Sequence, residues 1–148
     1  MIWGCMAAAG SENLVFIDGI MTKESYLKII RQNVERSVRK LLIGEDFIFQ
    51  QDNDPNHTAG VVQQYINQRG WEVIEHPPQS PDLNVIEHLW DEIDRRIDRI
   101  EVNTYEQLKG KISQVWLSVE PECAQKLVES MPRRLQQVIE AKGGNTSY

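Results

Sequence analysis

The sequence predicts an α/β fold in which a mixed sheet is covered by helices. Short apolar segments typical of strands alternate with segments of helical periodicity up to about residue 100, and only helices are expected from 101 to 148. Two apolar segments, Met1–Ala8 and Leu14–Ile20, are separated by the turn-forming residues Gly10–Asn13, which predicts an antiparallel hairpin. The strand–helix–strand order that follows implies parallel neighbours. At 148 residues, one domain accounts for the whole chain.

The segment after the hairpin is predicted to alternate between helices and short strands. Thr22 can cap a helix that runs to about Lys40, with Gly44 as its stop signal. Gly70 should end a second helix in the same way. The remaining elements of this segment are a strand at 47–49, the helix at 58–68 and a strand at 71–75.

Capping and proline signals place the helices of the second half. The proline-rich run 77–81 cannot form regular structure, because proline lacks an amide donor. Asn84 is a suitable N-cap for the next helix, and Thr104 with Gln107 forms a capping box for another. Pro121 suits the first turn of a helix reaching Met131, where Pro132 should break it before a last helix. The predicted apolar face of the helix after Asn84 contains Ile86, Leu89, Trp90, Ile93 and Ile97.

Composition and charge limit the classes of function. The net charge is −6 and the sequence pI about 5.1, so attraction of the whole surface to phosphate backbones is not expected. No apolar run approaches the roughly 20 residues that a membrane span needs. Contact with DNA would have to be local, although each basic cluster is also explained as a solvated helix face. These clusters are Arg31/Arg36/Arg39/Lys40, Arg95/Arg96/Arg99 and Arg133/Arg134.

Two acidic residues stand apart because of their positions. Asp52 lies where an apolar strand ends in a polar turn, and such strand ends bind ligands in open α/β sheets. Glu87 lies in the first turn of a helix, where the helix N-terminus favours a carboxylate. Carboxylates on rigid elements are the ligands that Mg²⁺ requires. The alternative is that both only stabilise local structure, since acids are common in turns and first helical turns.

Two long sequence words carry a resemblance to a known family. The words are FIFQQDNDPNHTA (residues 47–59) and HPPQSPDLNVIEHLWDEIDRR (residues 76–96), and they resemble signatures of the mariner superfamily of DNA transposases. The similarity continues upstream through residues 3–27 and downstream through residues 129–148, so it covers essentially the whole chain. The chain therefore resembles the C-terminal part of a DDE transposase catalytic domain.

The resemblance implies a ribonuclease H-like fold and a divalent metal site, with Mg²⁺ or Mn²⁺ as cofactor. Asp52 and Glu87 match the second and third catalytic acids, with 34 residues between them as in the Glu-ending branch. His57 and Asn53 match the same word and are expected to support the site, although packing or turn stabilisation explains His57 equally well. His88 is expected at the surface, and no role is predicted for His76.

The resemblance also implies partners and a reaction. The family cleaves DNA with a metal and transfers the 3′ end to a target, which would make transposon ends and target DNA the partners and the nucleus the location. Association with full-length transposase or self-association is a further expectation. The DNA-binding residues are not identified by the sequence.

Two departures from the family pattern bear on activity. The family's first catalytic Asp lies on a central strand that would precede Met1, so we expect this chain to lack that strand and that ligand. Asp18 is a candidate substitute, whereas Asp54 is expected only to form a turn. Val85 stands where the family has proline, which affects helix start and not chemistry. A catalytic chain, a non-catalytic remnant that binds protein or DNA, and an inert fragment therefore remain alternatives.

Overall fold

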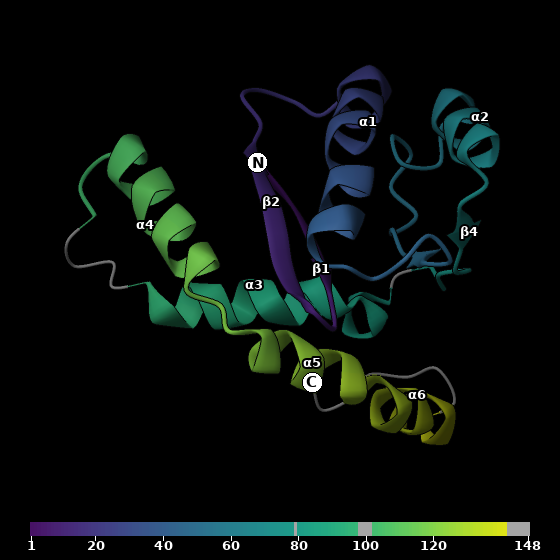
Figure 1. Cartoon of the computed structure of the whole chain (residues 1–148). Coiled ribbons are helices and arrows are strands. Elements are labelled where there is room, and N and C mark those ends of the chain that lie inside the picture. The colour runs from purple at the N-terminus through teal and green to yellow at the C-terminus, as the bar shows by residue number, and fades with distance from the viewer. Residues whose placement is uncertain (79, 98–101, 142–148) are drawn as a thin grey trace.

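The computed structural model describes residues 1–78, 80–97 and 102–141. Its elements follow the predicted order of hairpin, helix, strand, helix, strand and then helices (Figure 1). They are β1 (Ile2–Ala7), β2 (Gly10–Phe16), α1 (Lys23–Lys40), β3 (Ile48–Phe49), α2 (Gly60–Arg69), β4 (Glu72–Val73), the 3₁₀ helix η1 (Pro81–Leu83), α3 (Val85–Arg96), α4 (Tyr105–Leu117), α5 (Pro121–Glu129) and α6 (Met131–Glu140). Arg99 of the second basic cluster lies outside the described residues.

The first two strands form the predicted antiparallel hairpin, but its turn was misplaced. Ala7 pairs with Gly10, so Ala8 and Ala9 form the turn and the segment predicted as a turn begins β2. Gly10 has φ +136, a backbone conformation that favours glycine and closes this short connection. The second strand ends at Phe16, before the predicted limit at Ile20.

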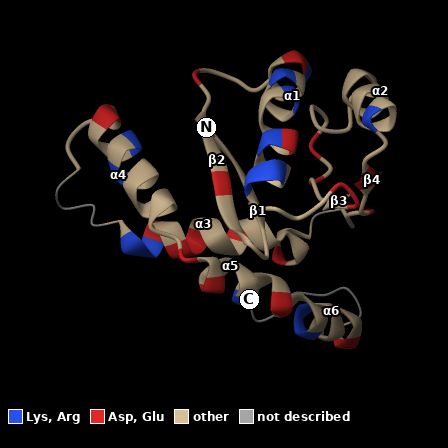
Figure 2. Cartoon of the chain, in the orientation of Figure 1, with Lys and Arg blue, Asp and Glu red and all other residues tan. Residues whose placement is uncertain are grey.

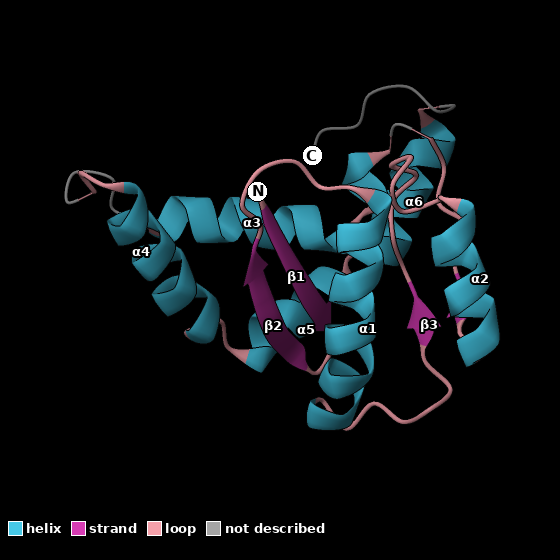
Figure 3. Ribbon diagram, turned by 90° about the horizontal axis from the view of Figure 1, so that it is seen from above, coloured by secondary structure: helices cyan, strands magenta, loops and turns pink. Residues whose placement is uncertain are grey.

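The strands form two separate sheets in the described residues, as expected for a mixed sheet that lacks its central strand. β1 pairs with β2, while β3 pairs with β4 in parallel over two residue pairs. Figure 3 shows the hairpin and β3 as separate pieces on either side of α1. A cavity of about 950 Å³ is lined by β1 and by β3, which agrees with the expected gap at the position of a central strand.

Two hydrophobic clusters cover the faces of the hairpin. One joins α1 to α2 through buried residues that include Ile30, Val34 and Ile66. The other packs α3 and α4 against the hairpin through Leu89 and Trp116. Both clusters pack against side chains of the hairpin, so the hairpin lies between helical layers, with α3 and α5 below it in Figure 1.

Helix ends follow the predicted chemistry with three exceptions, the third of which is Asn84, whose side chain does not cap its helix. Thr22 and Thr104 each form a capping box. The stop signal predicted at Gly44 is wrong, because α1 is capped at Leu41 and Leu42 takes a positive φ of 53°.

The second exception is Pro132, which does not break a helix. α5 ends at Glu129, and Pro132 lies in the first turn of α6, where a missing amide hydrogen costs no helical hydrogen bond. Among the described residues, no helix is both long and apolar enough to cross a bilayer.

Candidate metal site

Asp52 follows β3 after two glutamines, and its side chain is held by the turn that comes next. Asp52 Oδ1 accepts a hydrogen bond from the Asp54 amide at 3.1 Å and lies 2.5 Å from Nδ1 of His57. The carboxylate is half-exposed, whereas the His57 side chain is 17% exposed. One oxygen of Asp52 is therefore occupied by the protein, while the carboxylate stays accessible.

The ring of His57 is itself fixed. It stacks on Tyr26 of α1 with ring centroids 3.9 Å apart, and the Tyr26 hydroxyl donates to Gln51 Oε1 at 2.7 Å. Gln51 Nε2 in turn donates to the carbonyl oxygen of His57 at 3.1 Å. His57 thus contacts Asp52 and also packs against α1, which combines the two roles considered for it.

Glu87 lies in the first turn of α3. Asn84 occupies the cap position as predicted, but its side chain does not cap the helix; its Nδ2 donates to Glu87 Oε1 at 3.3 Å instead. Burial raises the pKa of the Glu87 carboxyl, and the charges of Asp52 and then Asp91 raise this pKa further, while His88 lowers it. The charge of Asp52 therefore acts on Glu87.

Two amide side chains join the loop of Asp52 to the loop before α3. Gln50 Nε2 donates to the Leu83 carbonyl at 2.9 Å and lies 3.4 Å from Nδ1 of His76. Asn53 Nδ2 donates to the His76 carbonyl at 2.6 Å. The sequence interpretation missed Gln50 and assigned no role to His76, which is buried between these loops. The only sequence signal for Gln50 was a polar amide directly after an apolar strand.

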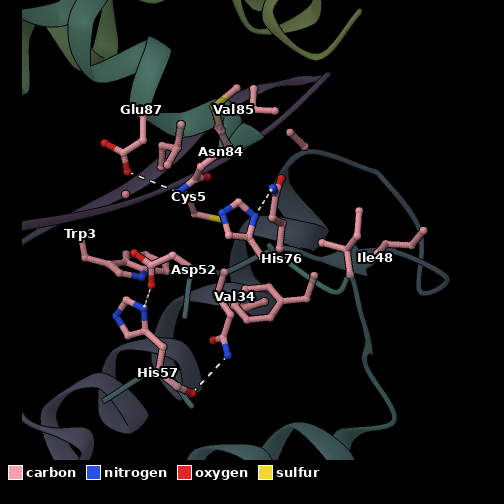
Figure 4. Close-up of a pocket in the computed structure, with 18 of the residues that line it drawn as sticks. Trp3, Cys5, Val34, Ile48, Asp52, His57, His76, Asn84, Val85 and Glu87 are labelled. Carbon is pink, nitrogen blue, oxygen red and sulfur yellow. Dashed lines mark hydrogen bonds and ion pairs between the residues drawn. The ribbon is translucent and has the colours of Figure 1, made fainter. Parts of the chain in front are cut away.

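Asp52 and Glu87 line one pocket of about 360 Å³, together with Asn53, Asp54 and Asn84. Figure 4 shows both carboxylates on the same side of the larger cavity, which they also line. The described residues that line the smaller pocket include no lysine or arginine. A bound cation would offset the negative charge that a phosphate meets in this pocket.

The donor set fits a divalent metal in part. Two carboxylates on a loop and a helix match the one or two that Mg²⁺ takes alongside waters and phosphate oxygens. No cluster of three or more His, Cys, Asp or Glu side chains suited to a metal occurs in the part of the chain that the structure describes. Asp18 lines neither pocket and lies 3.6 Å from Lys109, so the structure does not place it as a substitute ligand.

Most of the basic clusters have local partners or are buried. Arg95 and Arg96 pair with Glu92 in their own helix, and Lys40 pairs with Glu12 at 2.6 Å. Arg134 is buried, so the interpretation of Arg133/Arg134 as a solvated face is wrong for that residue. Exposed arginines remain on α1, where Figure 2 shows basic residues along the helix.

Comparison with known proteins identifies the family. Residues 1–109, which include Asp52 and Glu87, match the model of the DDE superfamily endonucleases. The chain belongs to this family. It is a portion of a Tc1/mariner-type catalytic domain, because over all of its 148 residues it is 39% identical to the Tcb1 transposase of Caenorhabditis briggsae and 37% identical to the Tc1 transposase of Caenorhabditis elegans. The chain spans 54% of the length of each of these relatives.

Solved structures show the same fold. The catalytic domain of the Mos1 mariner transposase matches this chain with a TM-score of 0.88 at 19% sequence identity. The match covers 99% of this chain and 75% of that domain. The Mos1 strand transfer complex matches with a TM-score of 0.86 at 20% identity, over 99% of this chain and 43% of that one. The ribonuclease H-like α/β fold expected for this chain is therefore confirmed.

The environment of Glu87 gives a testable prediction about stability. The fold favours the protonated carboxyl, so wild-type protein loses stability as pH rises from the unfolded-state pKa through the higher folded-state pKa. Glu87→Gln removes this loss. We expect the variant to melt at a higher temperature than wild type at pH 7.5, with the difference vanishing below about pH 4. Thermal unfolding between pH 4 and 8 measures it, and an equal or lower melting temperature at pH 7.5 would contradict the prediction.

Proposed function

We propose that this chain contributes two metal ligands, Asp52 and Glu87, to a catalytic domain that cleaves DNA and transfers its 3′ end. The observation that carries the proposal is that these two carboxylates, 35 positions apart in sequence, line one pocket and interact electrostatically. Transposase relatives along the full length of the chain support the reaction class.

The proposed cofactor is Mg²⁺ or Mn²⁺. Solved structures of the Mos1 catalytic domain with Mg and with Mn support this choice. When bound, such an ion polarises the phosphodiester and lowers the pKa of the attacking hydroxyl or water. The chain itself holds the two ligands in place. His57 and the Asp54 amide restrain Asp52, and Asn84 restrains Glu87. The side-chain amides of Gln50 and Asn53 hold the two loops together.

DNA ends and target DNA are the proposed partners, and paired-end complexes of Mos1 support self-association as a further proposal. Because these partners are DNA, the nucleus is the proposed location.

The second candidate is a non-catalytic remnant that binds protein or DNA. The observation that favours it is that no group of three or more His, Cys, Asp or Glu side chains suited to a metal occurs among the described residues.

Mn²⁺ binding tests the ligand assignment directly. We expect Asp52→Asn to raise the Kd for Mn²⁺ by more than about 100-fold, beyond the 10- to 100-fold typical of residues that only support a ligand. The measurement is a titration followed by the electron paramagnetic resonance signal of free Mn²⁺. Asp46→Asn is the matched control, because it removes the same charge from an exposed residue six positions before Asp52 that lines neither pocket. Equal effects of the two substitutions would refute the assignment of Asp52.

A further inference from the structure

We propose that Arg134 of α6 is a positioning residue that holds the first turn of α3, and with it Glu87, in the candidate metal site. The inference rests on the proposed function of Glu87. It also assigns a role to α6, which lies outside residues 1–109 that match the family model.

The first observation is the contrast between two neighbouring arginines. Arg133 is exposed, whereas Arg134 is 7% exposed. An arginine keeps its charge when buried, so its burial is costly unless its donors are satisfied. Arg134 Nε donates to Ser130 Oγ at 2.8 Å, and Ser130 Oγ donates to the Leu127 carbonyl at 2.6 Å. The guanidinium is thus oriented by the junction of α5 and α6.

The second observation is where that guanidinium points. Its Nη1 contacts both ring nitrogens of His88 and lies 3.1 Å from Nδ1. His88 follows Glu87 directly in the first turn of α3. The expectation that His88 lies free at the surface is therefore wrong, because a cation from 46 positions away packs against it.

The third observation is that His88 also contacts the element before α3. Its Nε2 lies 3.1 Å from the carbonyl oxygen of Asp82 in η1. Which ring nitrogen donates and which accepts depends on the tautomer of His88, but the ring contacts both Asp82 and Arg134. His88 therefore joins η1 to the first turn of α3, and Arg134 fixes His88 to α6.

These contacts constrain the backbone that carries Glu87. The Asn84 amide restrains the carboxylate itself, and Gln50 binds the Leu83 carbonyl at the end of η1. Arg134 acts on the same turn from α6, through His88. Loss of this contact would remove the restraint that α6 places on the start of α3.

The test uses this chain and three variants: Arg134→Ala, Arg134→Lys and Arg133→Ala. We expect Arg134→Ala to raise the Kd for Mn²⁺ by about 10- to 100-fold, as for residues that orient ligands. Arg134→Lys should restore part of this affinity, because it keeps the charge but not the planar fork. Arg133→Ala, the matched control one residue away, should bind Mn²⁺ as wild type does.

Hydrogen exchange at individual amides supplies the second readout. Exchange should quicken by about 10-fold or more at residues 85–89 in Arg134→Ala, while α1 keeps its wild-type rates. Unchanged exchange at residues 85–89 together with unchanged Mn²⁺ affinity would overturn the inference. If Arg134→Ala does not fold, the same two measurements on Arg134→Lys decide it, with weakened Mn²⁺ binding expected. If Asp52→Asn binds Mn²⁺ as wild type does, the proposed function fails. If Asp52→Asn binds Mn²⁺ weakly while the Arg134 variants bind it as wild type does, only the inference about Arg134 fails.

Discussion

Nicking of a labelled DNA duplex with Mg²⁺ or Mn²⁺ should require a segment upstream of Met1 that supplies a further carboxylate. We expect almost no cleavage by the 148-residue chain alone. Of the three carboxylates that line the smaller pocket, only Asp52 and Glu87 match the family's catalytic acids, and two-metal chemistry needs ligands for both ions. An extended chain carrying the segment that precedes the match in a relative should cleave. Its Asp52→Ala variant should lose more than about 100-fold in rate.

The outcomes of this assay separate the alternatives. Cleavage by the unextended chain that survives Asp52→Ala would refute the assignment of Asp52. Cleavage by the unextended chain that is lost on Asp52→Ala would show that another acid completes the site. Failure of the extended chain to cleave would favour the non-catalytic remnant.

Gly4→Ala should destabilise the fold by overpacking its second hydrophobic cluster. A Cβ at Gly4 would lie 2.6 Å from Cη2 of Trp116 and 2.9 Å from Cη2 of Trp90. These two rings are stacked with centroids 4.9 Å apart and form part of the cluster between the hairpin and α3/α4. Either the stack or β1 must move, and such overpacking typically costs about 1–3 kcal/mol.

Thermal unfolding measures the effect, which should be a fall of several degrees in melting temperature. Gly110→Ala is the matched control, because its Cβ would meet nothing within 4 Å and the residue lies inside α4. Alanine there should raise stability by roughly 0.5–1 kcal/mol, since glycine is a poor helix former. Equal melting temperatures for Gly4→Ala and wild type would contradict the steric argument.

Local signals in the sequence were sufficient to predict most helices and drew attention to two acids by their positions. The resemblance to the transposase family then made these two acids metal-ligand candidates. An apolar strand followed by polar residues indicated Asp52, and the cap position of Asn84 indicated the first turn that carries Glu87. The hairpin turn was misplaced because Ala8 and Ala9 are not turn-forming residues, and the positive φ of Gly10 is visible only in the structure.

Contacts between distant segments could not be predicted in this way. Gln50 bonds to a carbonyl 33 positions away and Arg134 to a histidine 46 positions away, and no periodicity encodes either pair. The division into two sheets was likewise invisible to local patterns, because each strand shows only its own propensity and not its neighbour.

The β1–β2 pair is longer than the β3–β4 pair, and this difference affects how easily each pair of strands can open locally. The hairpin is paired from Ile2–Phe16 to Ala7–Gly10, whereas β3 and β4 share two pairs. The piece of backbone that leads to Asp52 can therefore open at lower free energy than the hairpin can. A ligand that bridges Asp52 and Glu87 would bind only the closed form and so stabilise it by mass action, by about 2.7 kcal/mol at a concentration of 100 times its Kd. Closing of this region and occupancy of the site are thus a single coupled equilibrium.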